Sequence, residues 1–186
     1  MRYNVKRRMY AATAVIVTTN SILMRGITMR ISFDLDEVLF VNPDKYETEP
    51  PLRFPYNKLY PERLRKGTIK LINDLQAQGD EVWVYTSSFR TTVYIKALFR
   101  HYGVKFDDIV NGYRHRDEVQ GKREQPMPMK MPNHFRIDLH IDDEDGVVKN
   151  SPMYGFRAMQ VFDPDDEWAD KVKEKVESIR KIVEKK

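Results

Sequence analysis

From residue 29 onward, short apolar segments of two kinds alternate along the chain. In the first kind, apolar residues follow one another or alternate with polar ones, which is typical of β-strands. These segments are residues 29–35, 82–85, 108–110, 135–141 and 158–162. In the second kind, apolar residues recur every three or four positions, as on the buried face of an amphipathic helix. These segments are residues 68–78, 91–102 and a C-terminal stretch from 164.

Glycine, proline and aspartate mark where the predicted helices begin and end. Gly79 and Gly103 follow the first two helices, where glycine commonly ends a helix. Asp163 and Pro164 predict the N-cap and first position of the last helix. Segments 37–65 and 112–134 contain several prolines, so we expect them to be irregular.

Strands that alternate with helices predict an α/β fold. We expect a Rossmann-like three-layer sandwich, in which a central parallel sheet is covered by helices on both faces. The expected domain comprises residues 29–186, a length that suits a single hydrophobic core. In such sheets ligands bind at the carboxyl ends of the strands, so polar residues there are the candidates for function.

The predicted strand ends carry acidic and hydroxyl side chains, and a lysine precedes the fourth strand. In chain order, these residues are Asp34, Asp36, Thr86, Ser87, Lys130, Asp142 and Asp143. Carboxylates gathered at one edge repel one another unless a cation lies between them. Hard oxygen ligands without histidine or cysteine favour Mg²⁺. Such an ion, with an ammonium and a hydroxyl, suits the binding of a phosphoryl group.

In order and spacing, these segments resemble the four motifs of the haloacid dehalogenase (HAD) superfamily of phosphohydrolases. ISFDLDEVL (31–39) is similar to the first motif, an apolar strand followed by Asp-x-Asp, and VWVYTSS (82–88) to the second. Lys130 is the best match to the lysine of the third motif, although Lys122 and Lys149 are also in range. DLHIDDEDG (138–146) resembles the fourth motif, an apolar strand that ends in an acidic pair.

The resemblance implies a phosphatase and a role for each catalytic residue. Asp34 would be the nucleophile that forms an aspartyl-phosphate. Asp36 would protonate the leaving alcohol and then deprotonate the hydrolytic water. Lys130 would neutralise the nucleophile and the transferring group.

The resemblance also implies the binding residues. Thr86 and Ser87, with nearby backbone N–H groups, would hold phosphoryl oxygens. The implied Mg²⁺ ligands are Asp34, the backbone carbonyl of Asp36, Asp143 directly and Asp142 through water. Two positions depart from the family pattern, since Glu37 replaces a frequent glycine and Glu144 a frequent serine. These acidic side chains leave open a non-catalytic protein that binds phosphate or metal and acts in regulation.

Two segments that hold family cap domains are short here. Segments 37–65 and 112–134 are too small for a separate domain, so we expect a capless or minimally capped enzyme with an open site. Such a site would accept a phosphorylated small molecule or macromolecule, or rely on a second subunit to cover it. His140 alternates onto the same side as Asp142, and we interpret it as a structural histidine. We expect Trp83 and Trp168 to lie in the core.

The location of charge changes how the composition is interpreted. The 186 residues carry a formal charge of +4, but residues 1–28 contain five basic residues and no acidic one. Residues 29–186 are therefore slightly acidic. The high isoelectric point of the whole chain is thus only weak evidence that the protein binds nucleic acid. A phosphatase that processes nucleic-acid ends stays open as an alternative. The chain has no cysteine, which excludes disulfides, thiolate metal sites and cysteine nucleophiles.

Residues 1–28 allow three interpretations. Basic residues ahead of an uncharged run over 9–24 resemble a signal peptide, and residues 13–18 are rich in β-branched residues, as in a strand. We favour the third, a poorly ordered extension outside the core, because a complete strand begins at Met29. The uncharged run is shorter than the ~20 residues of a membrane-spanning helix, and we expect a cytoplasmic protein without membrane contact.

Overall fold

The structure is a computed structural model that describes residues 27–162 and 164–185. The three interpretations of the N-terminal extension, and the predicted N-cap Asp163, lie outside the described residues. Within the described part of the chain, no helix has the length and apolar character needed to cross a membrane.

A five-stranded sheet with the strand order β3-β2-β1-β4-β5 forms the centre of the fold. All of its neighbouring strands are parallel. The strands are β1 (Arg30–Phe33), β2 (Glu81–Tyr85), β3 (Asp108–Val110), β4 (Leu139–Asp142) and β5 (Ala158–Gln160). Because β1 pairs with both β2 and β4, its carboxyl end lies in the middle of one edge of the sheet.

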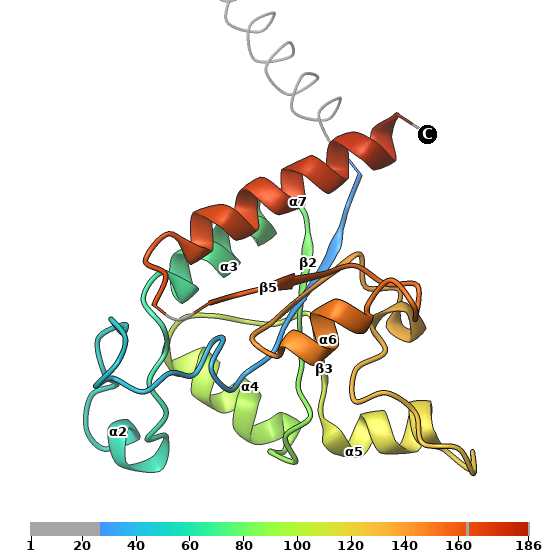
Figure 1. Ribbon diagram of the computed structural model, residues 1–186. Coiled ribbons are helices and arrows are strands. Elements are labelled where there is room, and N and C mark those ends of the chain that lie inside the picture. Colours follow the sequence, from blue (N-terminus) through green and yellow to red (C-terminus); the bar gives the residue numbers. More distant parts are fainter. Residues whose placement is uncertain (1–26, 163, 186) are drawn as a thin grey trace, which may run out of the picture.

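Three helices pack on one face of the sheet, where their apolar stripes join the side chains of β1, β2 and β4 in one buried cluster. They are α3 (Thr68–Ala77), α4 (Thr92–His101) and α7 (Trp168–Glu184). Figure 1 shows α7 running alongside α3. The stripe of α7 includes Trp168, which is buried as predicted. Burial of these apolar stripes is the main force that fixes the helices on the sheet.

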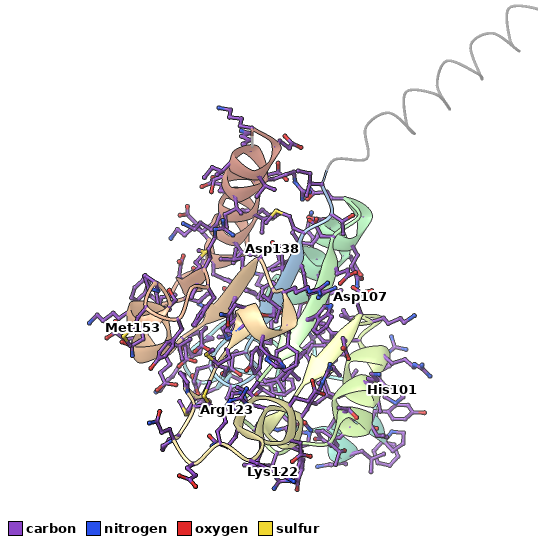
Figure 2. The ribbon with its side chains drawn as sticks, turned by 90° about the vertical axis from the view of Figure 1, so that its right-hand side faces the viewer. His101, Asp107, Lys122, Arg123, Asp138 and Met153 are labelled. Atoms are coloured by element: carbon purple, nitrogen blue, oxygen red, sulfur yellow. The ribbon has the colours of Figure 1, made fainter. Side chains whose placement is uncertain are left out.

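A second, smaller cluster covers the other face, so the predicted three-layer α/β fold is confirmed. Its members are Trp83, Tyr85, Val110, Val119, Phe135 and Ile137. They come from β2, β3 and the connection to β4, which contains short helices. These are α5 (Gly112–His115), the π-helical turn η1 (Arg116–Gln120) and the 3₁₀ turn η2 (Pro132–Phe135). Lys122 and Arg123 lie together on the loop that leaves η1 (Figure 2).

Three predictions of local structure were wrong or incomplete. Residues 112–134 are not wholly irregular, since they contain α5 and η1. The predicted strand 135–141 begins only at Leu139, because Phe135 ends η2 and Arg136 adopts a left-handed φ of 54°. The last helix begins at Trp168 instead of Pro164, and the backbone carbonyl of Asp165 ahead of it accepts a hydrogen bond from Arg65 at 3.1 Å.

Segment 37–65 is a flap without a domain of its own, as predicted. It contains the short helix α2 (Tyr56–Leu59), and isolated bridges link Phe40 to Leu64 and Thr48 to Arg65. The Tyr56 ring stacks on His101 of α4 with ring centres 3.8 Å apart. The short helix α6 (Asp145–Asn150) follows β4, with Asp143 and Glu144 between them.

Candidate active site

Three carboxylates meet at the carboxyl ends of β1 and β4. Asp34 follows β1, Asp142 ends β4, and Asp143 is the next residue; one oxygen of each lies within 4.8 Å of the others. The Asp34 N–H donates to the Ile141 carbonyl at 2.9 Å, so the pairing of the two strands continues up to the site. The backbone thus holds carboxylates from distant parts of the sequence at the spacing of ligands around one cation.

Lys130 lies among these carboxylates. Its side chain is 2% exposed, and its ammonium is 3.0 Å from Asp34 Oδ1 and 3.2 Å from Asp142 Oδ2. It also donates to the Tyr85 carbonyl at 2.9 Å, which ties the ammonium to the end of β2. Of the other lysines in range, Lys149 is exposed and pairs with Asp145. Lys122 is likewise exposed.

Asp142 is held by a network of buried donors. Its Oδ2 accepts from Lys130 and from His140 Nε2 at 2.9 Å, and its Oδ1 accepts from the Glu144 N–H at 2.9 Å. Burial opposes ionisation of Asp142, but the hydrogen bond from His140 and the charge of Lys130 hold its pKa well below the ordinary value. The oxygens of Asp142 are therefore largely occupied by the protein itself.

His140 is fully buried and extends this network into the sheet. Burial lowers the pKa of His140, which favours the neutral ring. A neutral ring with its proton on Nε2 donates to Asp142, and its Nδ1 then accepts from the Ser32 hydroxyl at 2.8 Å. The structural role predicted for His140 fits these contacts. The contact with Asp142 follows from the period of two that places both on one side of β4.

Asp143 has a different environment from its neighbour. It is half-buried, and burial together with the charges of Asp142 and Asp34 raises its pKa from 3.8 to about 6. A cation between these carboxylates would offset the repulsion between their charges and so favour the ionised form of Asp143. Asp34 Oδ1 is also buried and accepts no hydrogen bond, even though Lys130 is close, so it retains lone pairs for a further ligand. Hard oxygen donors with these properties fit a divalent cation such as Mg²⁺.

The carboxylate of Asp36 lies apart from the other three. Its side chain is 53% exposed and forms an ion pair with Arg90 Nη1 at 2.8 Å. Arg90 also donates to Ser88 Oγ at 2.9 Å and lies 3.4 Å from Glu62 of the flap. We did not single out Arg90 from the sequence, where its only signal is its place two residues after the second motif.

The second motif forms a tight loop at the end of β2. Thr86 is 1% exposed, and its Oγ1 accepts from the Ser88 N–H at 3.1 Å, whereas Ser87 is exposed. The N-cap of α4 is Thr91, whose hydroxyl accepts from the Tyr94 N–H. The hydroxyls of Thr86 and Ser87 are therefore not used to cap the helix.

Glu37, one of the departures from the family pattern, has a left-handed backbone with a φ of 56°. Glycine adopts this conformation without strain, which is a physical reason for glycine at this position in many family members. The Glu37 carboxylate is exposed and lies at a long 3.5 Å from the Tyr46 hydroxyl. It lies outside the group of three carboxylates described above.

Comparisons with known proteins address the fold. No protein-family model and no curated protein matches the sequence. The crystal structure of a HAD-superfamily hydrolase of subfamily IA from Geobacter sulfurreducens is similar, with 15% identity and a TM-score of 0.51. The similarity covers 80% of this chain and 99% of that chain.

The HAD domain of the effector protein Lem4 from Legionella pneumophila also resembles this chain. It is 13% identical, with 81% of this chain and 94% of that chain covered and a TM-score of 0.47. At such low identity the similarity to the Geobacter hydrolase concerns the fold alone. The chain thus has the HAD-like α/β fold that its four motifs predicted.

Proposed function

We propose that the protein is a magnesium-dependent phosphoric monoester hydrolase that forms an aspartyl-phosphate on Asp34. The observation that carries the proposal is the convergence of Asp34, Asp142 and Asp143 around the buried ammonium of Lys130. This group lies at the carboxyl edge of a parallel sheet, where α/β proteins bind ligands. The HAD-like fold supports the same reaction class by analogy.

The donor set suggests how the residues would share the ion. Asp34 and Asp143 would bind it directly, and Asp142 would act through water, because Lys130, His140 and Glu144 already occupy the Asp142 oxygens. When bound, Mg²⁺ supplies positive charge for the phosphoryl oxygens. Thr86 and Ser87 would donate hydrogen bonds to the same oxygens from the neighbouring strand end.

The reaction then needs two proton transfers. An oxygen of Asp34 attacks phosphorus, the ester P–O bond breaks, and Asp36 gives its proton to the leaving oxygen. A water then attacks the same phosphorus and gives its proton to Asp36, which releases phosphate and restores the Asp34 carboxylate. Lys130 stays beside the attacked group throughout, since its ammonium is fixed by the Tyr85 carbonyl.

Arg90 would position Asp36 for these transfers. Its guanidinium holds the Asp36 carboxylate at the open side of the site, where Asp36 must take up a proton from water before it can act as the acid. Arg90→Gln should lower kcat roughly 10-fold and change the pH profile with little effect on KM. Arg90→Lys should restore part of the rate, whereas a purely structural role would alter stability and leave the pH profile unchanged.

The decisive experiment measures Mg²⁺-dependent hydrolysis of para-nitrophenyl phosphate. Asp34→Asn should lower kcat by roughly 10³-fold or more and abolish a base-labile phosphoenzyme. Asp170→Asn is the matched control, because Asp170 is exposed on α7 and pairs only at the surface with Lys173. Full activity in Asp34→Asn would refute the mechanism. The absence of phosphomonoester turnover in the wild-type protein would refute the function.

A further inference from the structure

Phe89 and Tyr113 form an exposed pair of aromatic rings beside the candidate site. Their ring centres are 4.9 Å apart at an interplanar angle of 76°. Phe89 is 56% exposed and Tyr113 is 45% exposed, so neither ring is explained by packing in the core. The Arg116 guanidinium lies 5.5 Å from the centre of the Tyr113 ring.

The pair is held by a close crossing of two chain segments. Gly112, which precedes Tyr113, donates its N–H to the Ser88 carbonyl at 2.8 Å. A Cβ on Gly112 would lie 2.6 Å from the Ser87 carbonyl oxygen and 3.1 Å from the Phe89 ring, so only glycine fits there. The Asn111 amide also donates to the Arg90 carbonyl at 2.9 Å. These contacts keep both rings at the surface instead of letting them fold inward.

The same loop carries the hydroxyls that would bind phosphate, and the arginine that contacts the proposed acid Asp36. Phe89 lies between Ser88 and Arg90, and Arg90 contacts Asp36. Thr86 is three residues before Phe89, a span of at most ~10 Å. The part of a substrate that extends from the leaving oxygen beside Asp36 therefore lies within reach of the two rings.

We infer that this site takes phosphomonoesters whose alcohol carries an aromatic base, as in a nucleotide, and that Phe89 and Tyr113 stack on that base. The inference rests on the proposed function and names its substrate class. Aromatic side chains stack on any base because every base offers a π-face. The Arg116 guanidinium beside the Tyr113 ring adds a second planar group on which a base could stack.

The alternative occupant, a protein partner, fits the surface less well. A stable protein interface buries ~800 Å² on each side and has a core depleted of charge. Here the exposed apolar surface consists of two rings bordered by charged groups, namely Arg90, Arg116 and Asp117, which pairs with Arg116 at 3.0 Å. Two rings among charged groups match a planar base better than a folded partner.

The test compares ligands that differ only by the base. For the full-length protein with Mg²⁺, kcat/KM is measured for adenosine and uridine 5′-monophosphates and for ribose 5-phosphate. We expect at least a 10-fold preference for a nucleotide. Phe89→Ala and Tyr113→Ala should lower kcat/KM for that nucleotide about 5- to 100-fold. Both variants should leave ribose 5-phosphate within two-fold of wild type.

Two controls separate stacking from a change in fold. Tyr113→Phe keeps the ring and should retain the preference for the nucleotide. Phe162→Ala removes a 62% exposed ring after β5 and should leave kcat/KM unchanged for both the nucleotide and ribose 5-phosphate. If wild type hydrolyses ribose 5-phosphate as well as both nucleotides, the phosphatase stands and the inference is wrong. Equal losses for all substrates in the alanine variants would also overturn it.

A failure of the proposed function is recognised separately, because no phosphomonoester would then be hydrolysed. Equilibrium binding of the same three ligands to wild type and to Phe89→Ala then decides the inference. Tighter binding of a nucleotide than of ribose 5-phosphate, lost in Phe89→Ala, supports it. Equal or undetectable binding of all three ligands overturns it.

Discussion

Replacing Asp143 with asparagine should stabilise the metal-free protein at neutral pH. Burial and the charges of Asp142 and Asp34 raise the pKa of Asp143 from 3.8 to about 6, so its ionised form destabilises the fold. A rise of this size corresponds to about 3 kcal/mol. Because Asp143 is only half-buried, water screens part of the effect, and we expect Asp143→Asn to gain about 1.5 kcal/mol.

The gain should depend on pH in a direction that the raised pKa of Asp143 determines. The folded protein holds this proton more tightly than the unfolded chain, so wild type loses stability as the pH rises through about 6. The asparagine variant lacks this loss. Its advantage should be complete above about pH 7 and disappear below about pH 4. His140 is present in both proteins, so its own titration largely cancels in the comparison.

Urea denaturation at pH 7.5 measures the free energy of unfolding of wild type and of Asp143→Asn, first in EDTA and then with saturating Mg²⁺. Mg²⁺ should stabilise wild type and have little effect on Asp143→Asn, which reverses their order. Asp145→Asn is the control: Asp145 is exposed and pairs with Lys149, so its free energy of unfolding should change by less than about 0.5 kcal/mol. The reasoning is refuted if Asp143→Asn is no more stable than wild type in EDTA, or if Mg²⁺ stabilises both equally.

Two further substitutions test the packing and charge of the site by urea denaturation. Gly112→Ala should cost about 2 kcal/mol, because its Cβ would lie 2.6 Å from the Ser87 carbonyl oxygen. Gly146→Ala is the control, because the nearest atom lies 3.9 Å from its Cβ; it should leave the free energy of unfolding unchanged or raise it by about 0.5 kcal/mol. Equal losses of stability in the two alanine variants would contradict the close crossing at Gly112. Lys130→Met should cost about 3 kcal/mol or more in EDTA, since it leaves buried carboxylates without a counter-charge. Lys149→Met should change stability by less than about 0.5 kcal/mol, and equal effects of the two lysine variants would refute this role of Lys130.

Elements with an unambiguous hydrophobic period were predicted well. The helices expected over 68–78 and 91–102 are α3 (Thr68–Ala77) and α4 (Thr92–His101). Each pattern is local, because the side chains that define the period lie on the buried face of the same element.

The alternation over 135–141 was misleading because its apolar residues are buried for two different reasons. Leu139 and Ile141 belong to β4 and pack in the main cluster. Phe135 and Ile137 instead cover Trp83 on the other face of the sheet, from a 3₁₀ turn and the residues that follow it. A period of two in the sequence does not distinguish these cases. Only the tertiary packing does.

The sequence by itself determined the α/β class and the polar residues at the strand ends, because both depend on local periodicity and on where each apolar run stops. Only the tertiary structure decided which of these residues meet. Asp34 and Asp143 are neighbours because β1 pairs with β4, whereas Asp36, two residues from Asp34, turns outward to Arg90. The choice of Lys130 among three lysines, and the raised pKa of Asp143, likewise depend on burial and on charges brought together through space. These quantities vary with distance and solvent exposure, which the order of residues along the chain does not specify.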